Sequence, residues 1–202
     1  MFKFWGAAAN SHITQVRGTP ASGKTTLANL LQHYIAKQEP DASVVLVPSW
    51  RTQDQLDQKG GWRKWLADEW NAEDGSVLIV DEAQTSFRDI SFWTHIKGIN
   101  ENWRYRVITF STYGSTEDSA PTNHSPYPNQ VVGLHKIDHG DHIEAGLLLT
   151  EAEFDEFVKK RFIGHRFDKQ FLLGIYELTG GHVGACEDVL DVIQTDNVSY
   201  TR

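Results

Sequence analysis

The stretch Gly18-Thr19-Pro20-Ala21-Ser22-Gly23-Lys24-Thr25 decides how this chain folds, because it matches the phosphate-loop pattern G-x-x-x-x-G-K-[ST] in full. The glycines of such a loop let the backbone curl so that successive N–H groups point at phosphate oxygens. Residues 12–17 alternate loosely in polarity and predict a strand, and residues 24–36 carry leucines and an isoleucine at helical spacing. The sequence therefore predicts a phosphate site between a strand and a helix, whose positive end faces the same anion.

Each polar residue of this loop has an expected role toward a nucleotide. Lys24 is expected to reach the β- and γ-phosphates, and the Thr25 hydroxyl is expected to bind Mg²⁺. Thr26 is placed for the α-phosphate. The residues expected to contact the nucleotide in this part of the chain are Gly18, Thr19, Pro20, Ala21, Ser22, Gly23, Lys24, Thr25 and Thr26.

A second acidic element lies at the end of the apolar run 77–80. The run is followed by Asp81 and Glu82, and a parallel sheet would bring its end to the same edge as the phosphate loop. Asp81 can then hold Mg²⁺ through water, and Glu82 can activate a water for attack on the γ-phosphate. A GTP-dependent switch protein would carry D-x-x-G here, but position 84 is Gln84. This pair therefore favours a hydrolase of ATP.

Other polar residues leave alternatives open. Ser111 and Thr112 end a predicted strand over residues 106–111, where they either sense the γ-phosphate or cap the strand. Residues 135–138 read His-Lys-Ile-Asp, one residue away from the guanine-binding pattern N-K-x-D, so GTP remains an alternative to ATP. The candidates for a transition-state arginine are Arg104, Arg106, Arg161 and Arg166, although most surface arginines are merely solvated.

Periodicity predicts an α/β core followed by a small all-helical lobe. A long surface loop is expected over residues 112–130, which hold glycine, serine and three prolines without periodicity. The strands are expected at residues 12–17, 43–47, 77–80, 106–111 and 131–134. The helices are expected at 24–36, at 56–70 with a break at Gly60-Gly61, and at 90–99, 151–162, 169–178 and 183–193.

Several motifs together resemble the NTPase domain of Crinkler-type effector proteins of fungi and oomycetes, over roughly residues 11–195. They are Val16-Arg17-Gly18-Thr19-Pro20-Ala21-Ser22-Gly23-Lys24-Thr25-Thr26, Asp81-Glu82-Ala83-Gln84, Phe92-Trp93 and Ser111-Thr112-Tyr113-Gly114-Ser115. The resemblance implies an ATPase related to the AAA+ and STAND classes, a three-layer fold with a five-stranded, mostly parallel sheet of order 5-1-4-3-2, and a helical lobe that acts as a lid. It also implies secretion and action inside a host cell, with the nucleus as one destination.

The resemblance extends to the lobe. Thr179-Gly180-Gly181-His182 is similar to the lid motif of those classes, which is usually G-G-x-P, so Gly181 and His182 are expected to contact the nucleotide. Val183 stands where the motif has proline, so the sequence departs from the motif at this position. The domain plan that follows is an N-terminal extension 1–10, an NTPase core 11–134, a hinge 135–146, a helical lid 147–195 and a tail 196–202.

Composition narrows the possible partners. The formal net charge is -8 and no long run of Lys and Arg is present, which argues against direct binding of nucleic acid by this domain. No apolar run is long enough to span a membrane, and residues 1–10 lack the apolar core of a secretory signal, so a soluble chain is expected. Trp62, Trp65 and Trp70 fall near helical spacing and are expected in the core, with a partner surface as the alternative.

These observations predict Mg²⁺-dependent ATP hydrolysis that couples nucleotide state to lid movement. The alternatives are a module that holds nucleotide with negligible turnover, a GTPase and a small-molecule kinase. A further alternative is a zinc site at His135, Asp138, His139, Asp141 and His142. The sequence does not identify a downstream protein partner and leaves oligomerisation open.

Overall fold

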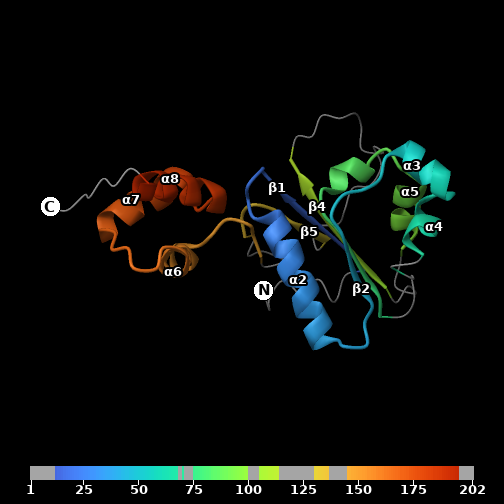
Figure 1. The fold of residues 1–202 in the computed structure, drawn as a ribbon, viewed down its shortest axis with the longest axis horizontal. Coiled ribbons are helices and arrows are strands. Elements are labelled where there is room, and N and C mark those ends of the chain that lie inside the picture. Colours follow the sequence, from blue (N-terminus) through green and yellow to red (C-terminus); the bar gives the residue numbers. More distant parts are fainter. Residues whose placement is uncertain are drawn as a thin grey trace.

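The computed structural model describes residues 12–67, 70, 75–99, 105–113, 130–136 and 145–195. Within them, five strands form one sheet of order β2-β3-β4-β1-β5 in which every neighbouring pair is parallel (Figure 1). This confirms the α/β class and the predicted order 5-1-4-3-2. The strands are β1 (Ile13–Gly18), β2 (Val44–Val47), β3 (Val77–Val80), β4 (Arg106–Thr112) and β5 (Val131–Val132).

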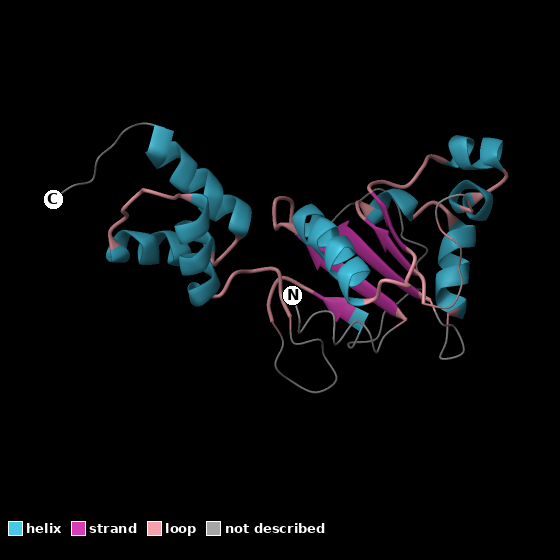
Figure 2. Cartoon of the chain, turned by 60° about the horizontal axis from the view of Figure 1, so that its bottom comes forward, coloured by secondary structure: helices cyan, strands magenta, loops and turns pink. Residues whose placement is uncertain are grey.

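Helices connect and follow these strands (Figure 2). The break predicted at Gly60-Gly61 is present, since both glycines have positive φ and separate two short helices. The helices are α2 (Lys24–Gln38), α3 (Gln53–Lys59), α4 (Trp62–Leu66), the 3-10 helix η1 (Ala83–Ser86), α5 (Ile90–Gly98), α6 (Glu151–Arg161), α7 (Lys169–Thr179) and α8 (Val183–Thr195).

The sheet separates two hydrophobic clusters, which makes the core three-layered. Successive strand residues point to opposite faces, so in β3 Ile79 packs under α2 while Leu78 packs on the other side, where α3, α4 and α5 lie (Figure 1). Both residues are fully buried, as central parallel strands require. β4 lies between β3 and β1, and the three strands are parallel, so their carboxyl ends meet at one edge of the sheet.

The layer formed by α3, α4 and α5 is rich in aromatic side chains. Trp62 and Trp70 are 5% and 4% exposed, which confirms their predicted burial, and Trp65 is half-buried. The rings of Trp50 and Phe92 lie 4.2 Å apart at their centroids. Because these rings pack on the face away from α2, they support the sheet.

The helical lobe, α6 to α8, has a hydrophobic core of its own. Phe154 of α6, Ile175 of α7 and Leu190 of α8 meet in it. The segment before α6 runs beside the end of β5, where Leu147 N donates to Gly133 O at 3.1 Å and Leu148 N to Leu134 O at 2.9 Å. The lobe lies to one side of the sheet layers, next to the start of α2 (Figure 1).

Most predicted elements differ from the observed ones by one to three residues at their ends. The fifth strand is shorter than predicted, since residues 133–134 do not continue it, and η1 was not predicted. Several predictions lie outside the described residues: the N-terminal extension 1–10, the tail 196–202, most of the loop 112–130, Gly114-Ser115, Arg104 and the segment 137–144. No helix among the described residues is long and apolar enough to cross a membrane.

Candidate nucleotide-binding site

The phosphate loop, residues 18–25, joins β1 to α2 and is held by its own polar groups. Ser22 Oγ donates to Thr19 O at 2.8 Å, and Lys24 Nζ donates to the same oxygen at 2.7 Å. Gly18 leaves room at the start of the loop, because a Cβ there would lie 2.5 Å from Leu147 Cδ1 and 2.5 Å from Ser22 Oγ, and both side chains would have to move. The loop therefore packs closely against the segment that leads into the helical lobe.

The backbone at this site adopts unusual conformations. Among the described residues, two that are not glycine have positive φ, Ala21 at 57° and Glu82 at 46°. Such conformations cost on the order of 1 kcal/mol or more, and they concentrate at functional sites. Both residues line the same cavity. The two strained residues therefore lie at the same cavity, although they are far apart in the sequence.

This cavity, of about 800 Å³, lies between the phosphate loop, the end of the sheet and the helical lobe. Its size lies within the range of small-molecule sites. The residues that line it are Pro20, Ala21, Ser22, Gly23, Lys24, Thr25, Thr26, Leu27, Leu30, Glu82, Thr112, Gly146, Leu147, Leu149, Val183, Gly184, Glu187 and Asp188. It thus combines the polar loop with an apolar wall of leucines and Val183.

Asp81 follows β3 and is 3% exposed, and its Oδ1 has no hydrogen-bond partner among the described residues. A buried carboxylate oxygen without a partner is costly unless it meets a cation or ordered water. Carboxylate and hydroxyl oxygens are ligands that Mg²⁺ accepts. The chemistry of Asp81 and of the Thr25 hydroxyl therefore fits a magnesium ion, and the magnesium site itself stays a prediction.

Lys24 is buried, and the carboxylates of Glu82 and Asp81 act on its charge. It is 6% exposed, and this burial lowers the pKa of its ammonium group below the usual value, while the carboxylates of Glu82 and Asp81 act in the opposite direction. These two charges thus help to keep Lys24 protonated, the form that binds phosphate.

The end of β4 separates the two candidate sensor residues. Register pairs Ser111 with Arg17 and Thr112 with Gly18, so consecutive residues face opposite sides of the sheet. Thr112 lines the cavity, whereas Ser111 is 7% exposed and is not part of its lining. The geometry thus places Thr112, and not Ser111, in the lining of the cavity.

Gln84 is a site residue that sequence reasoning did not select. Its Nε2 donates to Glu82 Oε2, and its Oε1 accepts from Thr112 N at 3.3 Å. In the sequence, Gln84 is informative only as a departure from the pattern D-x-x-G and as part of the resemblance carried by Asp81-Glu82-Ala83-Gln84. The signal that could have found it is the short spacing, because a residue two positions after Glu82 in a tight turn stays within reach of its carboxylate.

The helical lobe touches the phosphate loop directly. His182 Nε2 lies 2.9 Å from Thr19 Oγ1, and Gly184 N, in the first turn of α8, donates to Ala21 O at 3.1 Å. Neither Gly181 nor His182 lines the cavity; Gly181 instead accepts from Leu149 N at 2.9 Å. A nucleotide contact by this pair stays a prediction, whereas the lobe residues that do line the cavity were not predicted from sequence.

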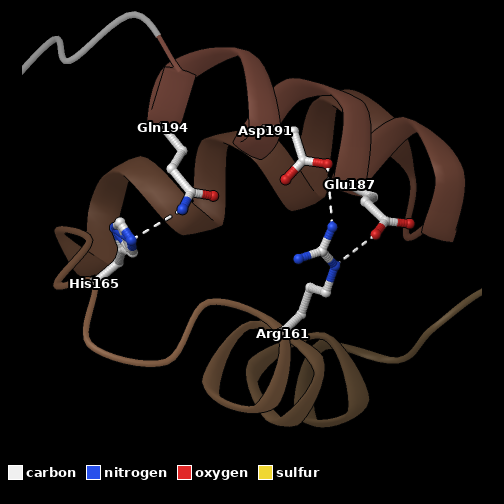
Figure 3. A network of polar contacts seen from close by, with 5 residues as sticks. All are labelled: Arg161, His165, Glu187, Asp191 and Gln194. Carbon is white, nitrogen blue, oxygen red and sulfur yellow. Dashed lines mark hydrogen bonds and ion pairs between the residues drawn. The ribbon is translucent and has the colours of Figure 1, made fainter.

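The charge that the lobe brings to the cavity is negative. Glu187 and Asp188 of α8 line it, and no arginine does so among the described residues. Arg161 of α6 binds Glu187 through Nε at 2.7 Å and Asp191 through its terminal nitrogen at 3.4 Å (Figure 3). Arg106, another candidate arginine, pairs with Glu39 away from the cavity.

No metal-binding group of three or more His, Cys, Asp or Glu residues occurs in the described part of the chain. The candidate zinc residues other than His135 lie in the segment 137–144, outside that part.

Comparison with solved structures assigns the fold. The chain matches Caenorhabditis elegans PCH-2 with a TM-score of 0.54 and 14% identity, over 100% of this chain and 61% of that one. It matches a mutant of Thermotoga maritima RuvB with a TM-score of 0.50 and 16% identity, over 98% of this chain and 61% of that one. The chain therefore has an AAA+-like P-loop fold, and it spans about 61% of the length of these proteins.

No protein-family model and no curated protein sequence matches the chain.

Proposed function

We propose that this chain binds ATP with Mg²⁺ and hydrolyses it, and that the helical lobe acts as a lid over the nucleotide. The observation that carries the proposal is the cavity itself. It brings the phosphate loop, Glu82 and the first turn of α8 to one place, although they are remote in sequence. The AAA+-like fold supports the same activity.

The proposed reaction is transfer of the γ-phosphoryl group to water. The water oxygen forms a bond to Pγ while the bond between Pγ and the β,γ-bridging oxygen breaks, and the water proton passes to the Glu82 carboxylate. The products are ADP and phosphate. Glu82 suits this role because it lines the cavity, is half-buried and lies close enough to Lys24 for its carboxylate to act on the pKa of that ammonium group. Lys24 contributes positive charge to the phosphates during the transfer.

Thr25 and Asp81 would hold the magnesium ion, which when bound would neutralise part of the phosphate charge. The support for this assignment is the unpartnered Oδ1 of Asp81.

The lid proposal rests on the contacts between α8 and the phosphate loop. Two hydrogen bonds, from Gly184 N to Ala21 O and between His182 and Thr19, join the lobe to the loop that would hold the phosphates. A nucleotide that alters the loop would therefore alter the position of the lobe. We propose residues 135–146 as the hinge and 147–195 as the lid.

A second candidate is a module that holds nucleotide with negligible turnover. The observation that favours it is the acidic pair Glu187 and Asp188 at the cavity, together with Arg161 held by Glu187 and Asp191. Negative charge near a triphosphate does not stabilise the charge that develops during phosphoryl transfer.

The finer assignments rest on sequence motifs alone. Membership of the Crinkler-type effectors, secretion into a host cell and the choice of ATP over GTP all stay predictions. Assembly of several copies is compatible with an AAA+-like fold and also stays a prediction.

Glu82→Gln tests the proposed reaction, because an amide keeps the size of the side chain but cannot take a proton from water. We expect the variant to bind ATP in calorimetry with unchanged affinity and to hydrolyse it at least about 100-fold more slowly in single-turnover assays. Glu177→Gln, an exposed position on α7, is the matched control and should behave as the wild type. Equal hydrolysis by both variants would remove Glu82 from the mechanism.

A further inference from the structure

Glu82 is held in its unusual conformation from two sides. Thr85 donates to Glu82 O through its backbone N at 2.9 Å and through Oγ1 at 2.8 Å, which fixes the backbone of Glu82 at φ 46° and ψ 42°. Gln84 Nε2 binds the Oε2 of its carboxylate. The side chain and the backbone of Glu82 are therefore fixed by different residues, and Gln84 is responsible for the side chain.

The orientation of the Gln84 amide follows from its two neighbours. A carboxylate only accepts hydrogen bonds, and the backbone N–H of Thr112 only donates one. The amide satisfies both with its NH₂ group toward Glu82 and its oxygen toward Thr112 N. The reversed orientation would place two acceptors together and two donors together. Gln84 thus links the end of β3 to the end of β4, and the residues that it joins, Glu82 and Thr112, both line the cavity.

We propose that Gln84 is a positioning residue for ATP hydrolysis, which orients the Glu82 carboxylate from the end of β4. The inference rests on the proposed hydrolysis. With Oε2 engaged by Gln84, the other oxygen of Glu82 is the one that accepts the proton of the attacking water. Because the amide oxygen accepts a hydrogen bond from Thr112 N, a shift at the end of β4 moves the Glu82 carboxylate as well. Thr112 itself faces the cavity, so contact with the bound nucleotide reaches Glu82 through this link.

The test compares two replacements of similar length. Gln84→Met removes both hydrogen bonds, and Gln84→Glu keeps the acceptor for Thr112 N but places a second carboxylate against Glu82. We expect Gln84→Met to lower kcat on the order of 10- to 100-fold through misplacement of the base, with the ATP dissociation constant unchanged. Gln53→Met is the matched control, because the Gln53 amide also donates to a carboxylate, Asp57 Oδ1 at 2.8 Å, on the exposed surface of α3.

A positioning role makes a prediction that a purely structural role does not. In the Glu82→Gln background, Gln84→Met should cause no further loss of rate, because the group that it orients is already disabled. Gln84→Glu has no NH₂ group to present to Glu82, so it should lose rate as Gln84→Met does.

The outcomes separate this inference from the proposed function. If the wild type releases phosphate and Gln84→Met does so at the same rate, the inference is overturned while the hydrolysis stands. It is also overturned if Gln84→Met costs the same factor with and without Glu82→Gln. A wild-type chain that binds ATP but releases no phosphate overturns the proposed hydrolysis and, with it, this inference.

Discussion

Gly184→Ala is predicted to lift the helical lobe from the phosphate loop. A Cβ at Gly184 would lie 2.6 Å from Ala21 Cβ and 2.6 Å from Ala21 O, about 1 Å inside normal contact. Ala21 cannot move away easily, because its φ of 57° is already strained and it belongs to the loop that precedes α2. The substitution should therefore displace α8 and break the hydrogen bond from Gly184 N to Ala21 O.

The size of the effect follows from the contacts that are lost. One backbone hydrogen bond contributes about 0.5–1.5 kcal/mol net, and the adjacent bond between His182 and Thr19 depends on the same placement of α8. A loss of about 1 to 2 kcal/mol lowers the ratio of docked to undocked lobe roughly 5- to 30-fold. Release of a fluorescent ATP analogue in stopped flow should accelerate by a factor in this range, and the first amides of α8 should exchange faster.

Gly174→Ala provides the matched control. Gly174 lies within α7 of the same lobe, and a Cβ there would meet nothing within 4 Å. This variant should release nucleotide at the wild-type rate and should be slightly more stable, because alanine favours a helix by about 1 kcal/mol over glycine. If Gly184→Ala and Gly174→Ala release nucleotide equally fast, with equal exchange in α8, the contact between lobe and loop has no role in binding.

Three further predictions concern other parts of the chain. Burial and the Arg63 guanidinium lower the pKa of His95 below its usual value of about 6.5. As the pH falls, the unfolded chain therefore protonates His95 before the folded chain does, so the folded state loses stability below about pH 6.5. His95→Gln should reduce the difference in urea midpoint between pH 7.5 and pH 5. An unchanged difference would refute the assignment. Asp89→Ala should lower the free energy of unfolding by about 2–4 kcal/mol in urea denaturation, because Asp89 caps α5 and accepts a hydrogen bond from Trp50 Nε1 at 3.2 Å. A loss below about 1 kcal/mol would contradict this prediction. Burial raises the pKa of the Cys186 thiol, so a thiol reagent should label the native chain far more slowly than the unfolded one; equal rates would place the thiol at the surface.

The order of strands and helices along the chain could be predicted because the sequence signals for each element are local. The run 77–80 is entirely apolar and becomes the fully buried strand β3, and the phosphate-loop pattern fixes the strand, turn and helix around Lys24. The sheet order came from the resemblance of the motifs. The short β5 was harder to delimit, because residues 131–134 differ little in polarity while only two of them pair with β1.

The site could be predicted where one motif supplies all the atoms and not where distant elements meet. Thr25 belongs to the phosphate-loop pattern and lines the cavity, but the carboxylates of Glu187 and Asp188 reach the cavity only through the packing of the lobe. Ser111 and Thr112 point to opposite faces of β4, and sequence alone does not say which face meets the loop. The positive φ of Ala21 and Glu82 has no sequence signal, since neither residue is glycine.

Release of phosphate from ATP by the purified chain, measured beside Lys24→Ala, tests the central claim most directly. Lys24 lines the cavity at the start of α2, and its ammonium group is the charge assigned to the β- and γ-phosphates. The proposed function predicts steady phosphate release that requires Mg²⁺ and is abolished in the variant. No release from the wild type, or equal release from both proteins, would contradict it.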